Sequence, residues 1–320
     1  MRIALITPAR PGTRNGNLHT AVRWAAMLRS AGHRVRVLQS WDGGADDLLV
    51  ALHARRSHDS IVRWNDERPG APLIVALTGT DLYRDLPRSA PARRSLDLAD
   101  RIIVLQDDAP RKLKKRWKNK TGVVYQSSGT TLRASPPKDR FRIVVVGHLR
   151  EEKDPFRAVL AVQLLNEDLE VIHVGGALDG PHRKAAQQWV KREHRYRWLG
   201  SLPHGRALRW IASSHLLVVS SRMEGGANVI AEAARIGTPV LASRMSGNLG
   251  MLGPSYPGYF PTGSEEGLAR LIARSKSDRK FYSRLKTAMS RRSPLFSPAG
   301  ERRALLGAVG EALRSRRASR

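Results

Sequence analysis

Two glutamates, Glu224 and Glu232, lie eight positions apart on either side of a glycine-containing turn. The apolar run at 216–219 predicts a buried strand before the turn, and an alanine-rich segment ending at Gly237 predicts a helix after it. Carboxylates on both sides of a helix N-terminus suit a ligand with hydroxyl groups flanking its phosphates, as in a nucleotide sugar. The backbone amides at this N-terminus belong to Gly225, Gly226, Ala227, Asn228 and Val229.

The stretch 220–243 resembles the Glu-x7-Glu motif of retaining-type, family 4-like glycosyltransferases with the GT-B fold. The resemblance rests on the glutamate spacing, on Gly-Gly before the helix and on Gly-Thr-Pro-Val-Leu-Ala-Ser after it. In that family the first glutamate contacts the donor sugar and the second holds the ribose. The resemblance therefore implies that Glu224 is a catalytic residue facing the sugar and that Glu232 binds the ribose. The alternative is an ordinary glutamate pair on a surface helix.

A second segment, Gly147–Lys153, follows the predicted strand at 142–146 and resembles the family's Gly-Arg-Leu-x-x-x-Lys segment. The Arg and Lys of that segment bind the donor diphosphate. Lys153 matches the Lys, and a fixed cation there would stabilise the charge of a departing diphosphate. His148 stands where Arg is usual, so Arg150 is the alternative source of the second positive charge.

Two loops of the first half have both a structural and a functional interpretation. Gly16 and Asn17 open the first predicted helix, and they either approach the donor phosphates or form an ordinary helix start capped by Asn17. A second loop follows the predicted strand at 73–77, and it either caps a short helix or presents amides and hydroxyls to an acceptor. It consists of Thr78, Gly79, Thr80 and Asp81.

The loop at 52–58 is unusually cationic for a sugar-acceptor site, because it places two arginines and two histidines after a buried strand. An anionic nucleophile would be held by such a loop. The candidate contacts in this loop are His53, Arg55 and Arg56. Outside the loop, Arg222, just before Glu224, could add to this positive charge.

Five segments together resemble the selenosugar synthases of selenoneine biosynthesis; they are 51–58, 77–86, 147–157, 221–229 and 256–261. That family joins selenophosphate to the sugar of UDP-N-acetylglucosamine or UDP-glucose through a carbon–selenium bond. The resemblance implies that His53 and Asp81 lie near the anomeric carbon, with Lys153 and Glu224 as the other catalytic residues. It implies selenophosphate contacts from His53, Arg55, Arg56, Thr78, Gly79, Thr80 and Arg222. We expect no metal and no cofactor, because Lys153 and the helix amides already neutralise the diphosphate.

Alternating apolar strands and amphipathic helices predict an α/β protein with two Rossmann-like domains whose parallel sheets face a cleft. The resemblance to the glycosyltransferases implies that these domains form a GT-B fold. We expect an acceptor-side domain at 1–134, a linker at 135–140 and a nucleotide-sugar-binding domain at 141–296. The segment 297–320 is expected to return to the first domain as a helix, with 299–316 as its predicted extent. The first-domain strands are predicted at 3–7, 35–38, 48–52, 73–77, 102–105 and 123–125.

The chain has 320 residues, no cysteine and a net charge of +28. The lack of cysteine suits a cytoplasmic enzyme, and no apolar run is long enough for a signal peptide or a membrane span. The positive charge is spread along the chain without a nucleic-acid-binding motif, so no specific nucleic-acid partner is expected. The basic run 111–120 is interpreted as a solvated surface helix rather than a stable membrane contact.

Two other functions remain open from the sequence. One is a GT-B glycosyltransferase that uses a hydroxyl or lipid acceptor at an anionic membrane. The other is a basic protein that binds nucleotide sugars or nucleic acid without turnover. If the first interpretation is correct, enzymes that supply selenophosphate are the expected pathway partners.

Overall fold

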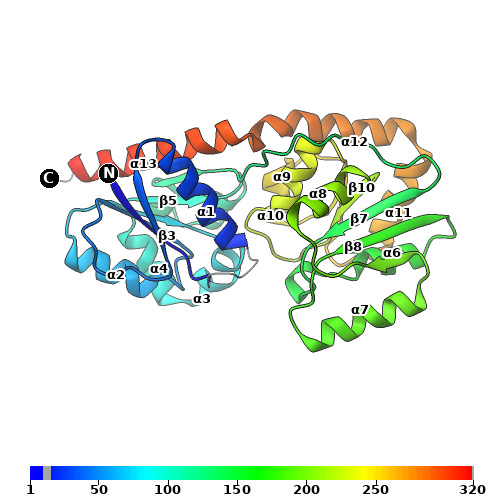
Figure 1. Cartoon of the computed structure of the whole chain (residues 1–320), viewed down its shortest axis with the longest axis horizontal. Helices are drawn as coiled ribbons and strands as arrows, with labels where there is room; N and C mark the ends of the chain where they lie inside the picture. Colours follow the sequence, from blue (N-terminus) through cyan, green and yellow to red (C-terminus); the bar gives the residue numbers. More distant parts are fainter. Residues whose placement is uncertain (10–15, 319–320) are drawn as a thin grey trace. The chain divides into compact units, whose positions relative to one another are not determined.

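The computed structural model describes residues 1–9 and 16–318 and divides into two compact units. Unit 1 comprises Met1–Gln126 and Pro298–Arg320, and unit 2 comprises Ser127–Ser297. Each unit is built on a six-stranded parallel sheet with helices around it (Figure 1). The predicted α/β class with two parallel sheets is therefore confirmed. Residues 10–15, in the loop before the first helix, lie outside the described residues.

The sheet of unit 1 has the strand order β2-β1-β3-β4-β5-β6. Its strands are β1 (Arg2–Ile6), β2 (Arg34–Leu38), β3 (Leu48–Leu52), β4 (Leu73–Ala76), β5 (Arg101–Val104) and β6 (Thr121–Val123). All five residues of β3 are buried, as a continuous apolar run in a parallel sheet covered on both faces requires. The last strand lies at 121–123 rather than at the predicted 123–125.

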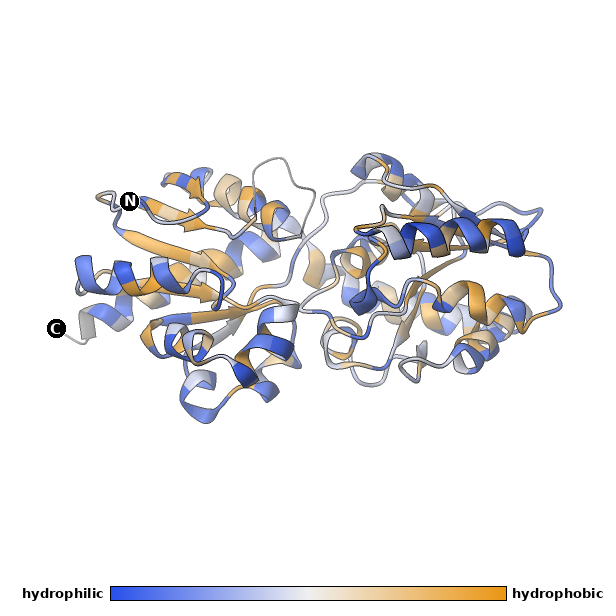
Figure 2. Ribbon diagram, turned by 90° about the horizontal axis from the view of Figure 1, so that it is seen from below, coloured by the Kyte–Doolittle hydropathy of each residue, from blue (hydrophilic) through white to orange (hydrophobic). Residues whose placement is uncertain are grey.

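The helices of unit 1 cover the two faces of its sheet. They are α1 (Gly16–Arg29), α2 (His58–Glu67), α3 (Leu86–Arg88), α4 (Ala90–Leu98), α5 (Lys115–Lys118) and α13 (Pro298–Ala318), with a π-helical turn η1 at Asp81–Asp85 and a 3-10 turn η2 at Ala109–Lys112. One core cluster joins α2 and α4 to the sheet, and the other joins α1 and α13 to its opposite face. The strands are mainly apolar, and the helices carry most of the polar residues (Figure 2).

Helix α13 is fixed to unit 1 by a buried carboxylate as well as by apolar packing. Leu305 and Val309 lie in the core cluster shared with α1. Glu301 is 1% exposed, and its carboxylate accepts a hydrogen bond from Trp24 Nε1 at 2.8 Å. The single N–H of Arg23 Nε is shared between its two oxygens, at 2.9 and 3.0 Å. The helix begins one residue before the predicted 299 and ends two residues after the predicted 316.

The sheet of unit 2 has the order β12-β11-β10-β7-β8-β9. Its strands are β7 (Phe141–Val146), β8 (Leu169–Val174), β9 (Tyr196–Trp198), β10 (Leu216–Val219), β11 (Val240–Ser243) and β12 (Tyr259–Phe260). Its helices are α6 (Arg157–Gln163), α7 (Gly180–Arg192), α8 (His204–Ala212), α9 (Asn228–Ile236), α10 (Ser246–Leu252), α11 (Glu265–Ser277) and α12 (Arg279–Arg292), with 3-10 turns η3 at Glu151–Lys153 and η4 at Ser293–Phe296.

The boundary between the units lies at Gln126, earlier than the predicted linker at 135–140. Backbone hydrogen bonds explain the difference: Ala134 N donates to Ile236 O at 3.0 Å, and Ser135 N donates to Ala212 O at 2.7 Å. The segment 127–140 is thus attached to unit 2, although it forms no strand.

The basic run 111–120 contains η2 and the short helix α5 rather than one surface helix. Trp117 is only 2% exposed, and the guanidinium of Arg116 lies 4.9 Å from its ring centre. The aromatic ring of this run is therefore part of the core. Within residues 1–9 and 16–318, no helix combines the length and the apolar character that a membrane span needs.

Candidate functional site

The loops after β7 and β10 meet in unit 2, because these strands are neighbours and parallel. The Ser220 hydroxyl lies 2.8 Å from the Asp154 carbonyl oxygen, and Arg222 N donates to Glu152 O at 2.8 Å. A small cavity lies between the loops, and Gly147, Lys153 and Ser220 are among its lining residues. The structure therefore brings the two predicted donor-binding segments together.

Lys153 and Glu224 form an ion pair in this site, with side chains that are 21% and 9% exposed. The Ser221 hydroxyl donates to the same carboxylate oxygen of Glu224 at 2.7 Å. Gly247, at the start of α10, contributes to this geometry, because a Cβ there would lie 2.1 Å from the Glu224 carbonyl oxygen. The sequence analysis assigned no role to Ser221, although it lies in the motif segment 221–229, and it missed Gly247, which lies outside the motif segments.

Helix α9 begins at Asn228 directly after the loop that carries Glu224. Its N-cap residue, Ala227, has no side chain that could accept from the first amides. The predicted turn of Gly225, Gly226 and Val229 is thus placed at a helix N-terminus, where backbone N–H groups attract anions.

Glu232 lies in the second turn of α9, and its Oε1 is 2.9 Å from His204 Nε2 at the start of α8. The side chain of Glu232 is 13% exposed and that of His204 is 63% exposed. Each glutamate of the motif thus contacts a basic residue of unit 2, Lys153 for one and His204 for the other. Sequence reasoning missed His204, because the contact depends on the packing of α8 on α9.

The other predicted cations of unit 2 have different surroundings. His148 and Arg150 are both half-buried and flank Leu149, which pairs with Ala177 in the loop after β8. Arg150 Nε is buried and has no hydrogen-bond partner among the described residues. Arg222 is 53% exposed, and its Nε lies 3.8 Å from Asp154 Oδ2. Which of these cations contacts a ligand stays a prediction.

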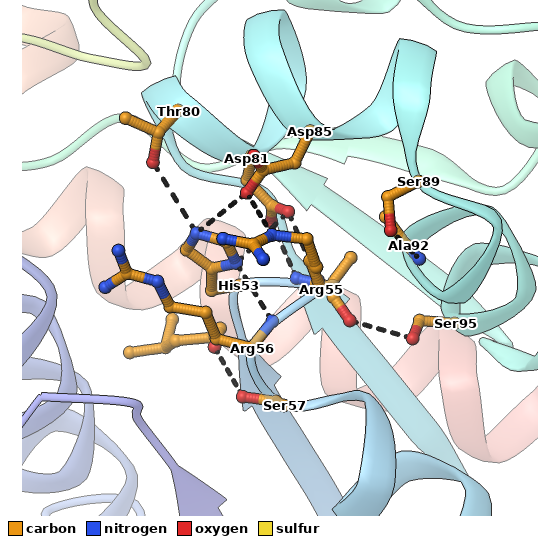
Figure 3. A network of polar contacts seen from close by, with 12 residues as sticks. His53, Arg55, Arg56, Ser57, Thr80, Asp81, Asp85, Ser89, Ala92 and Ser95 are labelled. Atoms are coloured by element: carbon orange, nitrogen blue, oxygen red, sulfur yellow. Dashed lines mark hydrogen bonds and ion pairs between the residues drawn. The ribbon is translucent and has the colours of Figure 1, made fainter.

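In unit 1 the loops after the neighbouring strands β3 and β4 meet around His53 (Figure 3). His53 has a φ of 76°, a region that non-glycine residues rarely adopt. Asp81 is fully buried and holds this turn, since its carboxylate accepts from Ala54 N at 2.6 Å and from Arg55 N at 3.4 Å. His53 Nδ1 lies 3.2 Å from Asp81 Oδ1. The structure brings the predicted pair His53 and Asp81 into contact.

Burial sets the charge of this pair. Burial lowers the pKa of His53 to about 4, and the nearby Arg56 adds to the effect, so the imidazole is neutral at pH 7. Burial also raises the pKa of Asp81 to about 7 against the backbone hydrogen bonds that favour its ionised form. Arg56 N also donates to His53 Nδ1 at 3.3 Å.

Asp85, which the sequence analysis missed, lies one turn after Asp81 in η1. Burial alone would raise the pKa of Asp85, but the hydrogen bond and charge of Arg55 outweigh it and lower the pKa. His53, Asp81 and Asp85 each offer a ligand atom within 4.8 Å of the others, so they could in principle hold a metal ion. Arg55 Nε already lies 2.8 Å from Asp85 Oδ2, and a metal ion would compete with this guanidinium.

The remaining predicted residues of unit 1 lie nearby or at the start of α1. Thr80 Oγ1 is 3.5 Å from His53 Nε2, in the loop that also contains Thr78 and Gly79. Gly16 is exposed at the first position of α1, followed by Asn17, and a Cβ on Gly16 would meet nothing within 4 Å. Packing alone therefore does not require glycine at this position.

The two parallel-sheet units define the fold class, which is the α/β GT-B fold. The sequence model described as "Glycosyl transferases group 1" matches residues 131–292, more than half of the chain. The chain therefore belongs to this glycosyltransferase family. The matched region contains Lys153, Glu224 and Glu232.

Solved structures with the same fold cover nearly the whole chain. Alr3699/HepE from Anabaena, solved with UDP and glucose, is 18% identical with a TM-score of 0.76 over 97% of this chain and 99% of that one. Sucrose-phosphate synthase from Thermosynechococcus elongatus is 17% identical with a TM-score of 0.78, and each chain is covered completely. The lipopolysaccharide outer core galactosyltransferase WaaB is 15% identical with a TM-score of 0.71 over 97% and 99%. At these identities the likeness is one of fold.

Proposed function

We propose that this glycosyltransferase transfers the sugar of a UDP-sugar, UDP-N-acetylglucosamine or UDP-glucose, to selenophosphate. The observation that carries the donor part is the Lys153–Glu224 ion pair beside the N-terminus of α9. Lys153 and the α9 amides would bind the diphosphate, Glu224 the sugar hydroxyls and Glu232 the ribose. The related structure of Alr3699/HepE with UDP and glucose supports a UDP-sugar as the donor class.

The acceptor part rests on the cationic loop of unit 1 and on the resemblance to selenosugar synthases. Arg55 and Arg56 have exposed side chains next to the buried, neutral His53. Together with Thr78, Gly79 and Thr80 of the same unit, they would hold an anionic nucleophile that needs little help from a general base. The resemblance to selenosugar synthases adds Arg222 to the proposed selenophosphate contacts. We include no metal in the proposal, because Lys153 and backbone amides supply the positive charge at the donor.

The proposed reaction balances without a redox partner. A selenium lone pair attacks the anomeric carbon, and the bond between that carbon and the diphosphate oxygen breaks. UDP leaves with the electron pair, and the first product is a glycosyl selenophosphate. Water then cleaves the selenium–phosphorus bond, which leaves the selenosugar of selenoneine biosynthesis and phosphate. The proposal includes a cytoplasmic location and a separate enzyme that supplies selenophosphate.

The test is an assay of UDP release with UDP-N-acetylglucosamine or UDP-glucose, with and without selenophosphate, followed by mass spectrometry. We expect a selenium-containing sugar and UDP only when selenophosphate is present, and an unchanged rate with EDTA. Lys153→Ala should abolish release. Lys276→Ala, whose ammonium pairs with Glu167 at 2.9 Å, is the control and should leave the rate unchanged.

Two other outcomes would replace the proposal. UDP release that depends on a hydroxyl-bearing lipid extract and not on selenophosphate would identify a lipid glycosyltransferase. Binding of the UDP-sugar without release under any condition would identify a binding protein without turnover.

A further inference from the structure

A buried histidine that the proposed reaction does not use lies near the end of β8, the strand next to the edge strand β9 of the unit 2 sheet. His173 of β8 is 1% exposed, and Tyr196 of β9 is 2% exposed. His173 Nδ1 lies 2.9 Å from the Tyr196 hydroxyl oxygen, and His173 Nε2 lies 3.3 Å from the Gly147 carbonyl oxygen. A carbonyl can only accept, so Nε2 carries the proton and Nδ1 accepts from the tyrosine hydroxyl. The three groups form one directed chain of hydrogen bonds.

The strand register makes this chain possible. His173 pairs with Val145 of β7 on one side and with Trp198 of β9 on the other. Gly147 follows Val145 by two positions, and Tyr196 precedes Trp198 by two, so both lie diagonally from His173 on the same face of the sheet. The imidazole of His173 thus links β9 to the loop that follows β7.

Gly147 begins the loop that carries Lys153, and its peptide is held closely by the loop after β8. Gly147 N donates to Val174 O at 2.9 Å. A Cβ on Gly175 would lie 1.8 Å from the Gly147 carbonyl oxygen, so this approach requires glycine. Trp198 Nε1 in turn donates to Gly175 O at 2.7 Å. The carbonyl that His173 binds is therefore fixed from both sides.

The histidine also reaches the donor site itself. His173 lines the cavity that Gly147, Lys153 and Ser220 line from the loops above. A displacement of the Gly147 peptide would therefore move the loop that ends in Lys153. Burial lowers the pKa of His173 to about 4, so the ring stays neutral and keeps its single orientation at neutral pH.

We infer that His173 and Tyr196 are positioning residues, which fix the Gly147 peptide and thereby the Lys153 loop for the donor diphosphate. The inference rests on the proposed role of Lys153 in diphosphate binding. A purely structural pair would stabilise unit 2 without affecting ligand affinity, and this difference can be measured.

The experiment compares two tyrosine variants that each lose one hydroxyl. Tyr196→Phe removes the donor to His173. Tyr282→Phe is the matched control, because its hydroxyl donates to the His215 carbonyl oxygen at the same 2.9 Å, just before β10. UDP affinity is measured by calorimetry, and the mobility of segment 145–155 is measured by hydrogen exchange. Tyr196→Phe should weaken UDP binding by about fivefold, the effect of one lost hydrogen bond, and should speed exchange in the segment.

Substitutions of the histidine complete the test. His173→Gln keeps an amide donor and should retain affinity better than His173→Leu, which has none. In turnover assays the KM for the UDP-sugar should rise more than the KM for the acceptor. Equal UDP affinities in wild type, Tyr196→Phe and His173→Leu would overturn the positioning role, as would equal weakening in Tyr282→Phe. If the wild type itself does not bind UDP, the donor assignment fails, and the positioning role fails with it.

Discussion

Glu224 neutralises Lys153 in the ligand-free protein, and this gives a prediction in which a variant binds better than the wild type. Glu224→Gln removes the negative charge and keeps an oxygen that can accept from Ser221. The freed ammonium of Lys153 should then attract the phosphates of UDP more strongly. UDP alone lacks the transferred sugar, whose hydroxyls Glu224 is proposed to bind. Its affinity should therefore rise on substitution without any loss of hydrogen bonds to Glu224.

The expected gain follows from the environment of the pair. Two unit charges ~4 Å apart attract by about 1 kcal/mol in water and by about 4 kcal/mol near a protein surface. Because the side chains of Lys153 and Glu224 are 21% and 9% exposed, we take a value between these limits, about 2 kcal/mol. This corresponds to UDP binding about thirtyfold more tightly. A UDP-sugar should gain little, since it loses hydrogen bonds to a charged acceptor worth about 1.5–3 kcal/mol.

Calorimetric titration with UDP and with UDP-glucose, at low ionic strength, measures both affinities. Glu170→Gln is the control, because Glu170 is a buried carboxylate of the same unit whose partners are Arg142 at 2.7 Å and Arg197 at 2.9 Å. It should cost stability without changing the affinity for UDP. Weaker or unchanged binding of UDP by Glu224→Gln would refute the reasoning, since it would mean that the carboxylate does not compete with phosphate for Lys153.

Three further predictions concern stability. Gly175→Ala should lower the free energy of unfolding in urea by about 1–3 kcal/mol, because its Cβ would meet the Gly147 carbonyl oxygen. Gly205→Ala, where a Cβ meets nothing within 4 Å, is the control and should not destabilise the protein. Equal effects would contradict the close approach of Gly175 to Gly147. The pKa of His173 falls from 6.5 to about 4 on folding, so the unfolded chain binds the proton more readily. The free energy of unfolding should therefore be highest above pH 6.5 and should fall by about 3 kcal/mol as the pH drops toward 4. His173→Gln should lose less stability over this range. Glu301→Ala should lower the free energy of unfolding by about 3 kcal/mol, because it leaves the buried Trp24 donor without an acceptor. The control is Glu311→Ala on the same helix, which should cost at most about 1 kcal/mol because the Glu311 side chain is 44% exposed. Similar losses would show that Glu301 does not anchor α13.

The strands were predictable because their composition alone defines them. A run such as Leu48–Leu52 has no polar side to expose, so it must lie in a sheet covered on both faces. The two units divide after Gln126, before the predicted linker. The prolines at 136 and 137 show only that a strand cannot continue there. Composition does not reveal which unit a segment without strand or helix is hydrogen-bonded to.

The sequence indicated the candidate site residues one by one but not the contacts between them. Motif spacing indicated Lys153 and Glu224 separately, yet their ion pair joins positions 71 residues apart and depends on β7 and β10 being neighbours. His204 and His173 gave no local signal, because a single histidine in a helix or strand has many ordinary uses. Their importance arises from the register and packing of elements that are distant in the sequence.

The position of α13 has a consequence for the synthesis of the protein. Helix α1 covers one face of the unit 1 sheet only in part, and Leu305 and Val309 of α13 pack in the same core cluster. These two residues follow all of unit 2 in the chain. At about 5–20 residues per second, a ribosome needs roughly ten to thirty seconds to add Ser127–Ser297 after unit 1 has emerged. During that interval the nascent sheet has an incomplete apolar cover, which is the kind of surface that chaperones bind. Helix α13, which is made after unit 2, must therefore pack on the sheet before the first unit can complete its core.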